Sequence, residues 1–115
     1  MRNTAYDCGS IRALGEIFKL LAEPNRLKIL CSLGLECRPV SDVVEATGLS
    51  QTNVSFHLRA LREAGLVRPE RRGPFIYYCL PDPALLKLLD DFRRWESARS
   101  IRAAGSAKRR RRAGG

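Results

Sequence analysis

Side chains that can hydrogen-bond to a ligand are concentrated in one short stretch of the sequence, SQTNVSFHLR, at residues 50–59. Amides of Gln and Asn donate and accept together, so they can make paired hydrogen bonds to an adenine edge, while Ser and Thr hydroxyls can meet bases or phosphates. The candidate contacts are Ser50, Gln51, Thr52, Asn53, Ser55 and His57. Their chemistry suits hydrogen bonding in the major groove of a duplex.

These residues must be positioned by a helix, and the sequence predicts one. Ser50 is suited to the N-cap position, and Gly65 is suited to the end of the helix. A shorter helix over residues 40–46 precedes it and is closed by Gly48. Together they predict a helix-turn-helix. The residues that should face the core are Val54, Leu58 and Leu61 of the second helix, and Val43 and Val44 of the first.

Two more helices are predicted upstream. Apolar residues recur at steps of three and four between Ser10 and Ala22, and Pro24 then begins a second helix that runs to about Leu33. On that second helix we expect Leu27, Leu30 and Cys31 to be buried. The glycine and proline in GLECRP predict a loop over residues 34–39.

Downstream, the sequence predicts a β-hairpin followed by a long helix. The hairpin tip is the basic turn at residues 71–74, and Tyr77 and Cys79 should share one face of the second strand. The last helix starts at Pro83 and carries a wide apolar stripe: Leu85, Leu86, Leu88, Leu89, Phe92 and Trp95. This stripe exceeds what one small core would cover, and from about Gly105 onward we expect disorder.

Length and charge limit the function classes. A chain of 115 residues suits one domain, and its net charge of +9 includes five charges from KRRRR at residues 108–112. The sequence lacks an 18-residue apolar run and a signal peptide, which predicts a cytoplasmic protein without membrane contact. It also lacks a Gly-rich phosphate loop and a nucleophile beside a base, so we expect neither an enzyme nor a required cofactor.

The segments SFHLRALREAGLV, LAEPNRLKIL upstream and YYCL downstream resemble the ArsR-type winged-helix repressors, which are small dimeric bacterial regulators. The resemblance spans residues 11–95. It implies a mainly α fold with a small β-hairpin wing, a recognition helix from Ser50 to Arg59, a wing tip at 71–74, and dimerisation through the first and last helices. It also implies a homodimeric repressor bound to double-stranded DNA at a palindromic operator.

Basic side chains near these elements are candidates for phosphate contacts, and each phosphate neutralised makes binding more sensitive to salt. The candidates are Arg59, Arg62, Arg71 and Arg72. His57 is the only histidine, so it has no histidine partner for a metal site, and either DNA contact or helix packing would explain it. The domain organisation predicted is an arm at 1–9, the winged helix-turn-helix and dimerisation domain at 10–98, and a basic disordered tail at 99–115.

The four cysteines are too irregularly spaced for a disulfide scaffold, so we expect reduced thiols. Members of the resembling family release DNA when a metal, a metalloid or an oxidant engages such residues. The arsenic-sensing pattern E-L-C-V-C-D-L would place cysteines where this chain has Pro39 and Ser41. Exposed settings nevertheless favour Cys8 and Cys37 as ligands for arsenic(III) or a soft metal, ahead of Cys31 and Cys79.

The remaining sensor patterns match less well. The zinc pattern of the last helix needs histidines that this chain lacks, and the redox pattern matches Cys31 but would need Cys79 as a substitute partner. Three hypotheses therefore remain open: a repressor induced by a metalloid or soft metal such as arsenite, a repressor that responds to thiol oxidation or polysulfide, and a non-specific architectural nucleic-acid-binding protein that uses the KRRRR tail.

Overall fold

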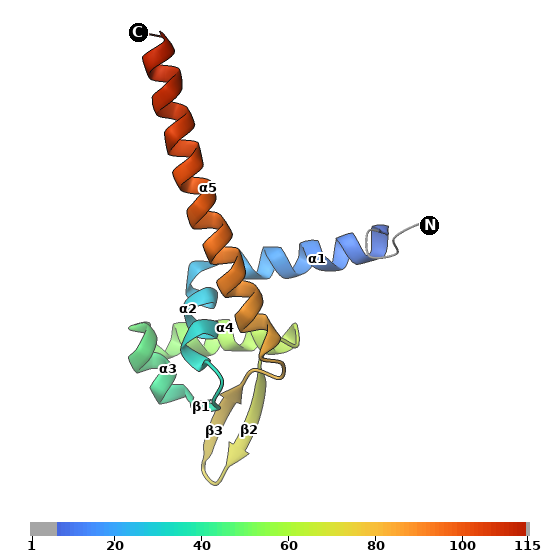
Figure 1. Cartoon of the computed structure of the whole chain (residues 1–115). Coiled ribbons are helices and arrows are strands. Elements are labelled where there is room, and N and C mark those ends of the chain that lie inside the picture. The colour runs from blue at the N-terminus through green and yellow to red at the C-terminus, as the bar shows by residue number, and fades with distance from the viewer. Residues whose placement is uncertain (1–6, 115) are drawn as a thin grey trace. The chain divides into compact units, whose positions relative to one another are not determined.

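The computed structural model describes residues 7–114, with side chains described up to residue 105 (Figure 1). The chain divides into two compact units, one ending at Pro83 and one beginning at Ala84. Over residues 7–114, the first unit holds four helices and a small sheet, and the second is one helix. Among the described residues, no helix is both long enough and apolar enough to cross a membrane.

The first helix, α1 (Cys8–Leu21), begins two residues earlier than the sequence predicted. Asp7 caps it, because its Oδ1 accepts a hydrogen bond of 2.7 Å from the Ser10 amide, and this bond holds the pKa of Asp7 below its usual value. The predicted arm at residues 1–9 therefore ends inside α1, and residues 1–6 of it lie outside the described part of the chain.

The second helix, α2 (Pro24–Leu33), starts with proline at its first position, as expected, and Glu23 caps it through the amide of Asn25. Its buried side is formed by Ile29, Leu30 and Leu33. The prediction that Cys31 lies in the core is wrong: Cys31 is exposed. The buried stripe contains Ile29 instead, and one step of about 100° past Leu30 turns residue 31 toward solvent.

The helix-turn-helix is confirmed as α3 (Val40–Thr47) followed by α4 (Gln51–Glu63). Gly48 adopts the left-handed conformation, with φ of 71°, and its amide donates to the Val44 carbonyl. Only glycine takes this conformation without steric cost, so the turn is specified locally. The Ser50 hydroxyl then caps α4 by accepting a hydrogen bond of 3.1 Å from the Asn53 amide.

The core of the first unit is made where α2, α3 and α4 meet. Its largest fully buried side chains, among the described residues, are Ile29, Leu30, Leu33, Val43, Val54, Leu58 and Leu61. Burial of each such side chain stabilises the fold by about 1.5–3 kcal/mol, before the entropy cost of ordering it. The inward direction predicted for Val54, Leu58 and Leu61 is confirmed.

The predicted hairpin is confirmed as β2 (Arg68–Arg72) and β3 (Phe75–Cys79), joined at Gly73 with φ of 61°. A third strand that the sequence did not predict, β1 (Arg38–Pro39), pairs antiparallel with the other side of β3. The strand order is thus β1-β3-β2, visible in Figure 1 as a short sheet ending in the hairpin loop. The segment predicted as a loop over residues 34–39 contributes this edge strand.

The second unit is α5 (Ala84–Gly114), which continues much further than the sequence predicted. It includes residue 99, where the predicted tail begins, and continues past Gly105. Ala and Arg dominate this part of the sequence and are strong helix formers, which explains a helix that continues after its apolar pattern fades. On its described part, Phe92 and Trp95 meet edge to face with ring centroids 5.5 Å apart.

Candidate nucleic-acid interface

One face of α4 is exposed and polar at its start. Gln51, Thr52, Asn53 and Ser55 are exposed, whereas the core residues of α4 lie on its opposite face. Ser50 is also exposed, although its oxygen already accepts the capping hydrogen bond and keeps only its hydroxyl hydrogen to donate. The start of α4, from residue 50 to residue 53 and again at Ser55, therefore presents polar side chains to solvent, as the sequence predicted.

His57 does not share this exposure. Its side chain is only 9% exposed, and its Nδ1 accepts a hydrogen bond of 3.3 Å from Nε of Arg26 on α2. Arg26 also donates from Nη1 to the Leu20 carbonyl, so the pair joins α4 to the junction of α1 and α2. Burial weighs against the predicted DNA contact from His57 and favours helix packing, the other role the sequence allowed.

Phe56 is a surface residue that the sequence did not single out. It is 64% exposed on α4, and its ring meets the His57 imidazole edge to face at 5.3 Å. An exposed aromatic ring among polar residues can contact the methyl group of a thymine base. The apolar periodicity of the helix identifies only its buried side. Phe56 lies outside that periodicity, and a large apolar residue in such a position is the sequence signal that could have identified it.

The four candidate arginines occupy two regions. Arg59 and Arg62 are exposed on α4, and Arg59 forms a surface ion pair of 3.3 Å with Glu63. Such exposed pairs are worth roughly 0.2–1 kcal/mol and can be exchanged for a phosphate at little cost. Arg71 and Arg72 are exposed at the end of β2, next to the hairpin turn. Both regions can supply positive charge to a phosphate backbone.

Two of the four cysteines are brought together by the sheet. Cys37 lies one step before β1 and faces Cys79 at the end of β3, with their Cα atoms 4.3 Å apart, and a disulfide joins them. The expectation of four reduced thiols is therefore wrong for this pair. Strand pairing across 42 residues brings the two cysteines together, and cysteine spacing gives no signal of it.

Glu70 completes the only group of three potential metal ligands found among the described residues, with Cys37 and Cys79. The ligand atoms lie within 4.8 Å of one another. Cys8 does not belong to this group: it is the exposed first residue of α1. The structure therefore does not bring Cys8 and Cys37, the two favoured ligands, together. The partner of Cys37 is Cys79, which the sequence favoured less.

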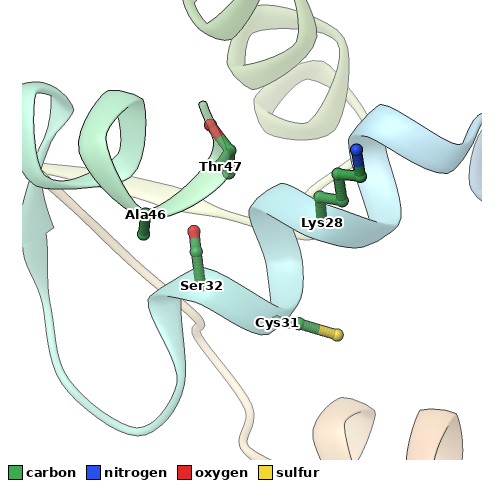
Figure 2. A pocket seen from close by; sticks show the side chains of 5 residues that line it. All are labelled: Lys28, Cys31, Ser32, Ala46 and Thr47. Carbon is green, nitrogen blue, oxygen red and sulfur yellow. The ribbon is translucent and has the colours of Figure 1, made fainter. Parts of the chain in front are cut away.

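Cys31 lines an open pocket between α2 and α3 with a volume of about 420 Å³, together with Lys28, Ser32, Ala46 and Thr47. Figure 2 shows its sulfur pointing away from Ser32 and Thr47. Both hydroxyls are already used locally, since Ser32 donates to the Ile29 carbonyl and Thr47 to the Val43 carbonyl. This pocket therefore offers a metal ion no convergent set of ligands.

Comparison with known proteins places this geometry in a family. The model of "Bacterial regulatory protein, arsR family" matches residues 23–68, which include α2, α3 and α4. The HTH-type transcriptional regulator NmtR of Mycobacterium tuberculosis is 40% identical over 85 residues, covering 74% of this chain and 71% of that protein. The arsenical resistance operon repressor of Bacillus subtilis is 36% identical over 84 residues, covering 70% of this chain and 78% of that protein.

Solved structures agree with this assignment. The crystal structure of Rv0081 from M. tuberculosis superposes with a TM-score of 0.70 at 34% identity, covering 79% of this chain and 91% of that one. The homodimeric winged helix-turn-helix DNA-binding domain of Mb0332 from Mycobacterium bovis gives 0.61 at 29% identity, covering 78% and 88%. The chain therefore belongs to the ArsR family of bacterial regulatory proteins, and it is a winged helix-turn-helix DNA-binding regulator of transcription, not an enzyme.

Proposed function

We propose that the protein is a homodimeric, sequence-specific transcriptional repressor, which occupies a palindromic operator until an inducer engages its cysteine thiols. The observation that carries this proposal is the division of α4 into two faces, one fixed in the core and one polar and exposed. A helix so divided fits the major groove of B-DNA, where amide side chains distinguish base pairs. The operon repressor among its relatives supports the repressor role.

In this proposal, base contacts and phosphate contacts come from different elements. Gln51 and Asn53 are the residues whose amides can pair with base edges, and Phe56 is suited to a thymine methyl group. The exposed guanidinium groups of Arg71 and Arg72 on the hairpin contact phosphates beside the groove, as do Arg59 and Arg62 on α4. Phosphate contacts fix the register of the protein on the duplex, and base contacts supply the sequence preference.

Dimerisation is supported by apolar side chains that each unit leaves exposed. On α1, Ile11 and Leu14 are both 55% exposed, and on α5, Leu88 and Trp95 are 65% and 53% exposed. Soluble monomers seldom keep such rows of large apolar residues in water. A two-fold dimer would present two copies of α4 to two half-sites, which is why the operator is expected to be palindromic.

The test is a footprint of the full chain on the DNA upstream of its own gene, with affinity measured by fluorescence anisotropy. We expect one protected palindromic site, bound by a dimer, with the same site protected after deletion of residues 105–115. Protection spread evenly over the probe, or abolished by deletion of the tail, would instead support the non-specific architectural protein. Random-sequence DNA of equal length is the control.

For the inducer, we propose a soft metal ion or a metalloid such as arsenite, bound by the Cys37 and Cys79 thiolates in their reduced form. Soft thiolate ligands favour such ions, and the Glu70 carboxylate could provide a third ligand atom. Relatives that carry arsenical or mercury resistance in their names support this class of inducer. Binding would release DNA only if the ion has unequal affinity for the two states of the dimer.

The disulfide between Cys37 and Cys79 favours a second candidate, in which an oxidant or a polysulfide is the inducer. Two neighbouring thiols are sufficient for a disulfide switch. Side-by-side titrations of the operator complex with arsenite, cadmium, zinc, a polysulfide and hydrogen peroxide separate the two candidates. Release by ions in the presence of a reductant supports the first, and release only by oxidants supports the second.

A further inference from the structure

A series of contacts connects the two sulfur atoms to the tip of the hairpin. The Glu70 Oε2 atom lies 3.5 Å from the Cys37 sulfur and 3.4 Å from the Cys79 sulfur. Its other oxygen, Oε1, accepts a hydrogen bond of 3.4 Å from Nε of Arg72. The Arg72 guanidinium carbon in turn lies 4.5 Å from the centre of the Tyr77 ring. One carboxylate thus contacts the cysteine pair and a candidate phosphate-binding arginine.

The strand register explains why these side chains meet. Cys79 is opposite Arg68 in the β2–β3 ladder, and Glu70 is opposite Tyr77. Residues two apart on a strand point to the same face, so Glu70 and Arg72 of β2 share a face with Tyr77 and Cys79 of β3. The β1–β3 register adds Cys37 on the other side of Cys79. The arrangement therefore follows from the backbone of the sheet.

We propose that Glu70 is a positioning residue that couples the redox state of the Cys37–Cys79 pair to Arg72, and so to the affinity of the hairpin for a DNA phosphate. This inference rests on the proposed function as an operator-binding repressor. It goes beyond that function by assigning a route from the sulfur atoms to the DNA-facing surface, through residues of one sheet face.

The chemical step is the oxidation of the dithiol by a peroxide. The two thiols lose two protons and two electrons, one S–S bond forms, the O–O bond of hydrogen peroxide breaks, and two waters are produced. In the disulfide-linked structure Glu70 Oε2 lies 3.5 and 3.4 Å from the two sulfur atoms, so after reduction the S–H groups are placed beside this carboxylate and can donate weak hydrogen bonds to it. The disulfide has no hydrogen to donate, so oxidation removes both of these donors from Glu70.

Removal of the thiol donors changes the competition for Arg72. In the reduced protein, the Glu70 carboxylate accepts hydrogen bonds from both the thiols and the Arg72 guanidinium. Its interaction with Arg72 is weaker for that reason, and Arg72 can bind a DNA phosphate instead. In the oxidised protein, Arg72 is the charged partner that Glu70 retains, as in the structure, where the disulfide and the Arg72–Glu70 ion pair occur together. Stacking on Tyr77 holds the guanidinium in place. Oxidation therefore weakens DNA binding by the hairpin.

The experiment uses the full chain with Cys8→Ser and Cys31→Ser, so that Cys37 and Cys79 are the only cysteines left. Both replaced residues are exposed free cysteines. Operator affinity is measured by anisotropy over a series of salt concentrations, after reduction with dithiothreitol or after oxidation with hydrogen peroxide. Peptide mapping by mass spectrometry then verifies the Cys37–Cys79 link in the oxidised sample.

We expect oxidation to lower the affinity of the dimer between about 2-fold and about 30-fold, because in each of two hairpins it removes an interaction the size of an exposed ion pair. The slope of log affinity against log salt should fall by about 0.9 for each phosphate that the oxidised dimer no longer neutralises. A merely structural disulfide would not change this slope.

Glu70→Gln tests the coupling itself, because it removes the charge that holds Arg72 and keeps the shape of the side chain. This variant should bind equally tightly in both redox states. Glu63→Gln is the matched control: Glu63 also pairs with an exposed arginine, Arg59, at 3.3 Å, but it belongs to α4 and not to the sheet that carries the cysteine pair. Its affinity should keep the full dependence on oxidation.

The outcomes separate this inference from the proposed function. If the reduced protein binds its operator, and verified oxidation leaves the affinity and salt slope unchanged, the coupling is wrong and the repressor function stands. Persistence of the redox effect in Glu70→Gln also overturns it, as does failure of peroxide to form the Cys37–Cys79 link. If the reduced protein binds no operator, the proposed function fails, and the inference fails with it.

Discussion

His57 of α4 accepts, at Nδ1, a hydrogen bond of 3.3 Å from Nε of Arg26 on α2. The contact spans 31 residues of sequence and lies beside the core that supports the recognition helix. Because Nδ1 is the acceptor, it carries no hydrogen in this arrangement, and the ring hydrogen belongs to Nε2. The single histidine thus links α4 to α2 by a side-chain hydrogen bond, in addition to their apolar contacts.

Removal of this hydrogen bond should destabilise the protein. We expect His57→Ala to lower the free energy of unfolding by about 1–3 kcal/mol, because it leaves a gap and removes the acceptor of Arg26 Nε. Urea denaturation followed by circular dichroism measures this change. His57→Asn places an oxygen near the position of Nδ1 and should recover part of the stability, whereas equal destabilisation by both variants would show that the hydrogen bond contributes nothing.

A base contact should change sequence preference. Gln51 lies exposed at the start of α4 and is not part of the core, so Gln51→Ala should fold normally and reduce discrimination at one operator position. Discrimination against the wrong base should fall by about 1–3 kcal/mol, if Gln51 makes a paired hydrogen bond to adenine. Binding to a set of single-base operator variants measures this. An unaltered preference would remove Gln51 from the recognition surface.

A phosphate contact should behave differently. Arg71 lies exposed next to the hairpin turn, where its Nε donates to the Gly73 carbonyl at 3.5 Å. Arg71→Ala should weaken binding to all operator variants to the same extent and reduce the salt slope by about 0.9 per phosphate. Gln51→Ala, measured in parallel, is the contrast: it should change the preference and leave the slope nearly constant. A slope unaffected by Arg71→Ala would place the hairpin tip away from DNA.

Dimerisation should depend on the exposed apolar residues of α5. Trp95→Ala is expected to raise the dimer dissociation constant by at least about 30-fold, since a buried aromatic at an interface typically contributes about 2 kcal/mol or more. Sedimentation velocity at several concentrations measures the shift. Ile101 is 73% exposed further along the same helix, beyond the predicted interface, and Ile101→Ala is the control. An equal effect of both substitutions would argue against the predicted interface.

Metal-dependent release should depend on the cysteine pair of the sheet. Cys37→Ser and Cys79→Ser should each abolish release of DNA by arsenite or cadmium under reducing conditions, because one thiolate cannot hold the ion. The double variant Cys8→Ser, Cys31→Ser should remain inducible, since neither residue belongs to the group with Glu70. Failure of induction in that double variant, with the pair intact, would return the site to Cys8 or Cys31.

The elements that could be predicted from the sequence are those that local chemistry controls. Gly48 specifies the turn between α3 and α4 because its positive φ suits glycine, and Ser50 specifies the start of α4 by capping it. The three-to-four spacing of Val54, Leu58 and Leu61 determined which face of α4 is buried, and therefore that the polar side chains before Phe56 face away from the core. Each of these signals acts within a few residues.

Contacts between residues far apart in the chain depend instead on how the elements pack. The strand β1 has two residues, which is too short to show the alternating apolar and polar pattern of a strand in the sequence. Its pairing with β3 brings Cys37 to Cys79 across 42 residues, beside Glu70. Burial of His57 likewise depends on Arg26, 31 residues away. Cys31 looked like a core residue from its spacing, but the packing of α2 selected Ile29 in its place. Periodicity shows that a helix has an apolar side, whereas packing against neighbouring elements decides which residues at its margin are buried.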